Sequence, residues 1–261
     1  MTIDWFDLSG RTALVTGAGH GIGEGIAEAF AAVGARVIVA DIDQGNAERV
    51  AQKVGGVALR LDVSDEQAVE AAFADIAEDG GVDILVNNAG VFDGLGVPLH
   101  EFTTDMWRRV TSVNLDGVFF CARAAARLMI AAGKGGRIIN ISSTQATAPG
   151  GGIAYDGTKA AIIQMSRSMA LDFGAHRINV NTIAPGPIWS EPGPAPDLRG
   201  APLLPFDSPG AQSINRHLAN LPQDHWGVPL DVGKAAVFLA SSMGDRVTGA
   251  LLHVDGGWTV L

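Results

Sequence analysis

Residues 12–30, TALVTGAGHGIGEGIAEAF, decide the fold of this 261-residue chain. The apolar start predicts a short buried strand, and Ile22, Ile26 and Phe30 then recur at helical spacing. A strand that passes through a glycine-rich turn into a helix is typical of a phosphate-binding turn. Glycines let the backbone approach a pyrophosphate, and the amino end of the helix supplies unpaired N–H groups. The turn therefore predicts a dinucleotide-binding site at this point of the fold.

The same alternation continues along the chain. It predicts strands at 12–17, 36–41, 57–63, 82–90, 137–142, 178–186 and 250–257. It predicts helices at 22–34, 46–54, 65–78, 104–132, 155–173 and 230–242. Because the strands read as continuous apolar runs separated by helices, we expect an α/β fold. The prediction is a doubly wound, Rossmann-type parallel sheet with helices on both faces, and residues 1–261 forming a single domain.

The stretch from 185 to 209 breaks this rhythm, because it holds eight of the chain's twelve prolines. Proline fixes φ and lacks a donor, and a loop this long in a compact domain is usually functional. We predict a proline-rich substrate lid at about 187–225, with a surface insertion of no functional consequence as the alternative. Arg216 and His217 in this region either contact an anionic substrate or, as the commoner case, lie on a solvated helix face.

Composition limits the classes of function. A net charge of -10 argues against a nucleic-acid partner. The first residues lack the apolar segment of a signal peptide and no apolar run reaches 18 residues, so we expect no membrane span and a cytoplasmic protein. Cys121, the single cysteine, lies in an apolar run and is expected to be a small buried or interface residue. The six histidines lack metal-ligand spacing, so we expect no catalytic metal.

Carboxylates end two of the predicted strands. Asp41 ends the second strand, where a carboxylate can accept both hydroxyls of an adenosine ribose and repel a 2′-phosphate. No Arg or Lys directly follows Asp41, and His20 is the only basic side chain in the glycine turn. NAD is therefore the expected cofactor, rather than NADP. Asp62 ends the third strand and is expected to receive the adenine amino group.

The only tyrosine, Tyr155, lies four residues before Lys159. Removing hydride from an alcohol requires a base for the hydroxyl proton, and a free phenol has a pKa near 10, too high for work at neutral pH. Residues four apart share a helix face, and a neighbouring ammonium favours the phenolate. The pair therefore predicts an acid/base tyrosine whose pKa Lys159 lowers. Ser142, at a strand end, can hold the substrate oxygen.

Short motifs occur along the whole chain in a specific order: TGAGHGIG (16–23), NNAG (87–90), Asn114 in VNLDGVF, Ser142 in INISS, YDGTK (155–159), PGPI (185–188) and VDGG (254–257). In these motifs the chain resembles the short-chain dehydrogenase/reductase family. The glycine turn follows the family pattern TGxxxGxG at Thr16, Gly17, Gly21 and Gly23, and 13 residues separate Ser142 from Tyr155. Ser190 stands where many members have threonine.

The resemblance implies a catalytic set of Asn114, Ser142, Tyr155 and Lys159. In the family the serine holds the substrate oxygen, the lysine bonds the nicotinamide ribose, and the asparagine helps to hold a water that links the lysine to solvent. The residues expected to bind the cofactor lie on the glycine turn, at strand ends or in the catalytic set: Gly17, Gly19, His20, Gly21, Ile22, Gly23, Asp41, Asp62, Val63, Asn88, Ala89, Gly90, Tyr155, Lys159, Pro185, Gly186, Ile188 and Ser190. The residues expected to shape the substrate pocket follow the strand ends: Phe92, Asp93, Gln145, Gly152 and Trp189.

These observations predict an NAD-dependent dehydrogenase that acts on a small secondary alcohol such as a sugar, polyol or hydroxy acid. The alternatives are a biosynthetic carbonyl reductase of the ketoacyl type, which uses the same residues in reverse, and an NAD-binding sensor without turnover. The predicted helices at 104–132 and 155–173 carry few charges, so their surplus apolar surface favours subunit contacts. Family members commonly pair through these two helices, and we expect a homotetramer.

Overall fold

A seven-stranded sheet forms the centre of the protein in the computed structural model, which describes residues 5–191, 194–198 and 209–261. The strand order is β3-β2-β1-β4-β5-β6-β7. All six neighbouring pairs are parallel. The predicted doubly wound sheet and single domain are confirmed. The strands are β1 Thr12–Thr16, β2 Arg36–Asp41, β3 Val57–Arg60, β4 Ile84–Asn87, β5 Gly136–Ile141, β6 Ile178–Pro185 and β7 Leu251–Val254.

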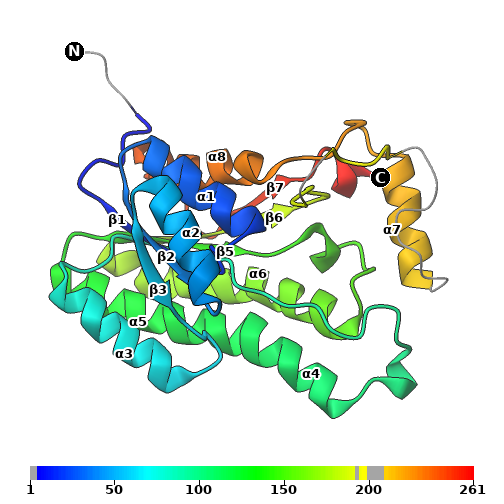
Figure 1. The fold of residues 1–261 in the computed structure, drawn as a ribbon, viewed down its shortest axis with the longest axis horizontal. Coiled ribbons are helices and arrows are strands. Elements are labelled where there is room, and N and C mark those ends of the chain that lie inside the picture. The colour runs from blue at the N-terminus through cyan, green and yellow to red at the C-terminus, as the bar shows by residue number, and fades with distance from the viewer. Residues whose placement is uncertain (1–4, 192–193, 199–208) are drawn as a thin grey trace.

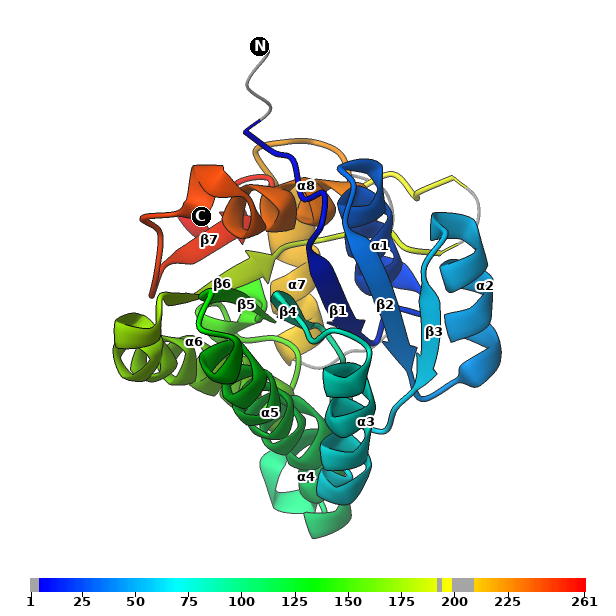
Figure 2. The same cartoon turned by 90° about the vertical axis from the view of Figure 1, so that its left-hand side faces the viewer.

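Two layers of helices cover the sheet (Figures 1 and 2). One layer consists of α1 (Gly21–Ala32), α2 (Gln44–Val54) and α8 (Pro229–Ala240). The other layer consists of α3 (Glu66–Glu78), α4 (Thr104–Thr111), α5 (Gly117–Ala132) and α6 (Ile153–Phe173). A further helix, α7 (Pro209–Ala219), stands apart from both layers, beyond the carboxyl ends of the strands.

Successive strand residues point into different cores, because side chains alternate across a strand. Val15 packs with Ile26 and Phe30 beneath α1 and α8, whereas Leu14 packs with Phe73 beneath α3 and α5. Each of these side chains is at most 3% exposed. Burial of both faces explains why the strands read as continuous apolar runs.

Two helical features were missed by the sequence prediction. The helix expected over 104–132 is interrupted by a π-helical turn at Ser112–Asp116, which separates α4 from α5. Helix α7 lies inside the predicted lid at 187–225, and residues 192–193 and 199–208 of that lid lie outside the described residues. Several strands end earlier than expected; β3 ends at Arg60 and β4 at Asn87.

Cys121 lies on α5 and is fully buried. Burial raises the pKa of its thiol to about 12. The prediction of a small buried residue is therefore confirmed. No helix within the described ranges has the length and apolar character that crossing a bilayer requires.

Candidate active site

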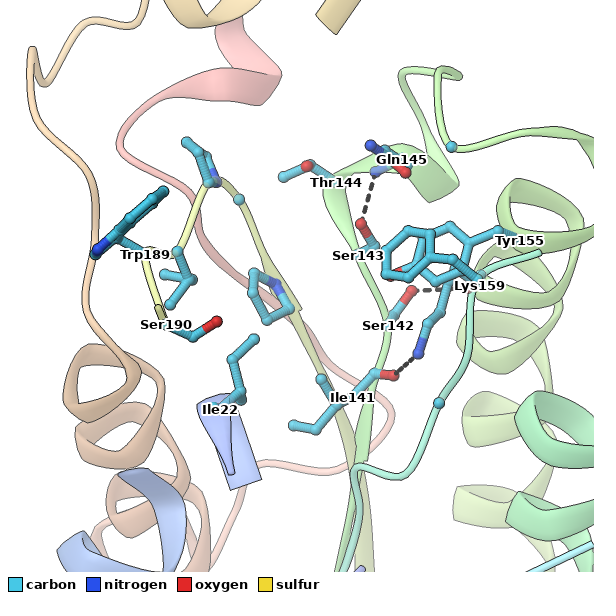
Figure 3. Close-up of a pocket in the computed structure, with 18 of the residues that line it drawn as sticks. Ile22, Ile141, Ser142, Ser143, Thr144, Gln145, Tyr155, Lys159, Trp189 and Ser190 are labelled. Carbon is cyan, nitrogen blue, oxygen red and sulfur yellow. Dashed lines mark hydrogen bonds between the residues drawn. The ribbon is translucent and has the colours of Figure 1, made fainter. Parts of the chain in front are cut away.

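A cavity of about 1210 Å³ opens at the carboxyl ends of the strands. Its walls come from the glycine turn after β1, the segments after β4, β5 and β6, and the start of α6. In parallel α/β sheets, ligands bind outside the carboxyl ends of the strands. Figure 3 shows Ile22, Trp189 and Ser190 on one wall of this cavity, facing Ser143 and Tyr155 on the other. The cavity therefore brings together residues that lie more than 160 positions apart in the chain.

The glycine turn is closed by backbone contacts that a side chain would prevent. A Cβ at Gly17, where φ is +61°, would lie 2.8 Å from the Cα of Ala89. A Cβ at Gly23 would lie 2.2 Å from the carbonyl oxygen of Gly17. Asn88 completes the turn, because its amide donates to the carbonyls of Thr16 and Gly17, both at 2.9 Å. Such a cradle fits a pyrophosphate at the start of α1.

Asp41 lies at the end of β2, as predicted, and is 5% exposed. Its carboxylate accepts the backbone N–H of Gly19 at 2.8 Å and that of Asp43 at 3.0 Å. The residue therefore holds the glycine turn in place, a role that sequence reasoning did not assign. A cofactor ribose would share this carboxylate with the two backbone groups.

A cation that sequence reasoning missed also lies at the glycine turn. Arg49 on α2 donates to the carbonyl of Gly19 at 2.8 Å and pairs with Glu24 at the same distance. The hydrogen bond from Arg49 lowers the pKa of Glu24 to about 2, so that this carboxylate stays charged at neutral pH. The signal in the sequence was the position of Arg49 on the helix after Asp41, but only the fold shows that its side chain turns back toward the turn.

Lys159 is 4% exposed and projects from α6 beneath the cavity (Figure 3). Its Nζ donates to the carbonyl of Ile141 at 2.9 Å. Burial lowers the pKa of this ammonium to about 8. Lys159 thus reaches the cavity from the helix face that the spacing predicted.

The two serines of INISS point in different directions. The Ser142 hydroxyl donates to the carbonyl of Lys159 at 2.7 Å and is therefore committed to helix α6. The Ser143 side chain instead lies beside Tyr155 on the same wall of the cavity (Figure 3), where it acts to lower the pKa of the phenol. The prediction that Ser142 holds the substrate oxygen does not agree with this geometry. The 13-residue spacing could not distinguish two adjacent hydroxyls whose directions depend on how the chain leaves β5.

Tyr155 is 8% exposed and lies against Phe92, with ring centroids 3.8 Å apart and planes at 16°. Burial raises the pKa of the phenol above its ordinary value, and Ser143 partly offsets that rise. The Nζ of Lys159 lies 5.5 Å from the centre of the Tyr155 ring. Burial by the packed rings is the largest effect on the pKa of the phenol in the protein alone, so the lowering by Lys159 stays a prediction.

Asn114 lies in the π-helical turn, and its side chain is fully buried. It accepts the N–H of Val91 at 2.9 Å and donates to the Val91 carbonyl at 3.1 Å. It also donates to the hydroxyl of Thr158 at 3.2 Å, next to Lys159 in the chain. π-Helical turns often occur at functional sites. Here the turn joins the segment after β4 to helix α6.

Of the predicted substrate residues, Gln145 and Trp189 line the cavity, and so does Phe92. Asp93 does not: its carboxylate accepts the N–H of Gly94 and lies 3.7 Å from Arg109. Gly151 lines the cavity in place of Gly152.

Most predicted cofactor residues also line the cavity, but five do not. The Asp62 carboxylate accepts the backbone N–H and the hydroxyl of Ser64, and Val63 is buried. The other three belong to the glycine turn or hold it: Gly19 and Gly23 lie in the turn without lining the cavity, and Asp41 accepts the N–H of Gly19. Within the described residues, no three His, Cys, Asp or Glu side chains gather as a set of metal ligands.

The fold and the site define an oxidoreductase of the Rossmann type, with a dinucleotide cradle facing a buried Tyr–Lys pair. Comparison with known proteins agrees with this class. A family model described as enoyl-(acyl carrier protein) reductase matches residues 17–259. A galactitol 2-dehydrogenase from Agrobacterium fabrum is 40% identical over 258 residues, which span 96% of this chain and 98% of that protein. A sorbitol dehydrogenase from Cereibacter sphaeroides is 38% identical, over 96% of this chain and 98% of its own.

A solved structure is similarly close. The gluconate 5-dehydrogenase from Burkholderia cenocepacia, in complex with NADP and tartrate, matches with a TM-score of 0.85 at 36% identity. The match covers 99% of this chain and 98% of that one. The chain belongs to the short-chain dehydrogenase/reductase family, as its motifs predicted. It is an enzyme that moves a hydride between a nicotinamide dinucleotide and an alcohol or ketone.

Proposed function

We propose that the protein is an NAD-dependent polyol dehydrogenase that oxidises a secondary alcohol of a sugar alcohol. The observation that carries this proposal is the contact between Tyr155 and Ser143 above the buried Lys159, on the cavity wall that faces Ser190. Galactitol and sorbitol dehydrogenases among the similar proteins support the substrate class. When bound, the nicotinamide supplies the hydride acceptor.

The chain's own groups then have separate roles. Tyr155 takes the proton of the substrate hydroxyl, and Ser143 donates to the same oxygen and holds it beside the phenol. Lys159 carries the positive charge beneath the phenol and binds the cofactor ribose. Asn114 connects the Lys159 helix to the segment after β4. Ser142 fixes the backbone of α6 through the Lys159 carbonyl.

The residues fit a nicotinamide dinucleotide, because Gly17 and Gly23 let the turn close against its own backbone and against Ala89, which side chains there would prevent. We assign the preference for NAD to Asp41, whose buried carboxylate would repel a 2′-phosphate. Arg49 is the nearby cation that could reverse this preference. Its pairing with Glu24 offsets its charge, and the same Nη2 also donates to the carbonyl of Gly19.

A matched pair of variants tests the catalytic assignment. Removing one donor to a reacting oxygen costs on the order of 10²–10³ in rate. Ser143→Ala should therefore lower kcat for galactitol or sorbitol by that amount. Ser142→Ala should keep kcat within a few-fold and cost about 1 kcal/mol of stability, since it removes only the bond to the Lys159 carbonyl. A larger loss of kcat in Ser142→Ala than in Ser143→Ala would instead assign the contact with the substrate oxygen to Ser142.

We also propose that the protein is a homo-oligomer, with a tetramer as the expected state. A groove of about 610 Å³ runs between α5 and α6. Its walls are mainly apolar, and Phe119 and Ile130 are 45% and 38% exposed there. A second copy of the same two helices would cover this surface, as expected for an isologous contact.

A further inference from the structure

Three tryptophans line the part of the cavity beyond the Tyr155 wall. Trp189 follows β6 and lies 5.7 Å from Trp226 between ring centres, with the planes at 59°. The Trp226 indole donates to the carbonyl of Pro196 at 2.9 Å, which fixes that ring in place. Trp258, after β7, is 4% exposed and stacks on His217 of α7 at 4.8 Å. We call these three side chains the tryptophan wall.

Positive charge is scarce around this wall. Among the lining residues that the structure describes, Lys159 is the one lysine or arginine, and it is bonded to the Ile141 carbonyl. Arg216 on α7 is exposed and does not line the cavity. His217 turns its Nδ1 to the carbonyl of Ser213 and its ring face to Trp258. The predicted alternative of an anion contact by Arg216 and His217 thus finds no support in this geometry.

The polar groups opposite the wall are neutral. Ser143, Thr144 and Gln145 line the cavity after β5 (Figure 3). Hydroxyls and amides can both donate and accept, so they match the hydroxyls of a polyol. A carboxylate in the same position would lose its hydration without gaining a cation, which is costly.

From these features, and resting on the proposed polyol dehydrogenase function, we infer that the cavity selects neutral sugar alcohols and rejects the matching sugar acids. The C–H face of the polyol packs on Trp189 and Trp226 of the tryptophan wall, because an indole offers a large apolar face and these two rings are only partly buried. Its hydroxyls meet Ser143, Thr144 and Gln145. A terminal carboxylate is excluded because Lys159 is the one lysine or arginine among the described lining residues, and its ammonium already bonds the Ile141 carbonyl.

Kinetics with matched substrates test this inference. Galactitol and galactonate share a carbon skeleton, as do sorbitol and gluconate, and each pair differs by one terminal carboxylate. With saturating cofactor, kcat/KM should favour the neutral member on the order of 100-fold. Equal turnover of the acid and the alcohol in either pair would overturn the inference.

Substitutions at Gln145 identify the source of the selectivity. Gln145→Lys adds a cation to the cavity, and Gln145→Met is the neutral control of similar length. The lysine variant should lower the preference for galactitol over galactonate about tenfold relative to the methionine variant, at equal melting temperature. An unchanged preference in a folded lysine variant would show that the selectivity does not come from charge.

Substitutions at Trp226 test the stacking surface. Trp226→Phe keeps an aromatic face but loses the bond to Pro196, whereas Trp226→Leu loses both. The phenylalanine variant should keep kcat/KM for galactitol within a few-fold, and the leucine variant should raise KM about tenfold or more. Equal effects of the two variants would mean that Trp226 acts only through Pro196, and would overturn the stacking role.

A second substrate pair separates this inference from the proposed function. The pair 2-butanol and 3-hydroxybutyrate contains a secondary alcohol without a polyol chain. Oxidation of 2-butanol alone, with no polyol turnover, would overturn the polyol assignment but support the inference that the cavity rejects carboxylates. Oxidation of 3-hydroxybutyrate as fast as 2-butanol would overturn the exclusion of carboxylates. Turnover of no member of any pair would overturn both this exclusion and the proposed function.

Discussion

Replacing Lys159 by methionine should change the pH dependence of stability in the cofactor-free protein. Burial lowers the pKa of Lys159 to about 8, against an ordinary value of 10.5. Between these two values the unfolded chain holds a proton that the folded protein has released, so the free energy of unfolding of the parent rises with pH. Integrating over the two pKa values gives a rise of about 2–3 kcal/mol between pH 7 and pH 10.

Lys159→Met removes this contribution. At pH 7 the variant avoids the desolvated ammonium but leaves the Ile141 carbonyl without its 2.9 Å partner, which costs about 1–3 kcal/mol. The two effects nearly cancel, so the variant should be as stable as the parent or slightly more stable at pH 7. At pH 10 the parent should be the more stable protein, by about 2 kcal/mol.

Urea unfolding at pH 7, 8, 9 and 10, at one protein concentration and without cofactor, measures this difference. Burial raises the pKa of both Tyr155 and Cys121, so both stay protonated in the folded protein over this range. In the unfolded chains they titrate alike, so their contributions cancel when the parent is compared with the variant. A parent-minus-variant difference that stays flat from pH 7 to pH 10 would refute the reasoning, because it would mean that burial does not destabilise the ammonium.

Three further outcomes are expected. Tyr155→Phe should lower kcat by about 10²–10⁴ while calorimetry shows unchanged cofactor binding; turnover within a few-fold of the parent would make the phenol structural. The parent should use NAD⁺ over NADP⁺ by roughly tenfold to several hundredfold, since a carboxylate about 4 Å from a phosphate costs about 1–4 kcal/mol, and Asp41→Asn should narrow that ratio in steady-state kinetics. Equal efficiency of the parent with both cofactors would contradict the role of Asp41. Light scattering should give a multiple of 27.0 kDa that Phe119→Glu reduces, and a 27.0 kDa parent at micromolar concentration would exclude the oligomer.

The sheet could be predicted from sequence because burial on both faces leaves a strong apolar signal in each strand. The interruption at Asn114 could not, because Ser112–Asp116 stays helical and only its hydrogen bonding changes. Helix α7 did leave a signal: Ala211, Ile214 and Leu218 are buried at helical spacing, after a proline that suits a first turn. The surrounding prolines dominated the interpretation of that region.

The sequence predicted most residues of the site but not the directions in which their side chains point. The spacing of Tyr155 and Lys159 predicted that both lie on one face of a helix, because four residues make about one helical turn. Spacing could not show that Ser142 turns to a helix carbonyl and Ser143 to the phenol. Nor could it show that Arg49 reaches the glycine turn, because that contact depends on how α2 lies against α1.

The burial of Cys121 makes the protein a convenient host for spectroscopic labels. A thiol with a pKa of about 12 and no exposed surface does not react with maleimides at neutral pH, since the thiolate is the nucleophile. A cysteine introduced at an exposed site would then be the only labelled position, without removal of a native residue. With Ala219→Cys, for example, a fluorophore at the end of α7 would report on that helix alone while sugar alcohols are added.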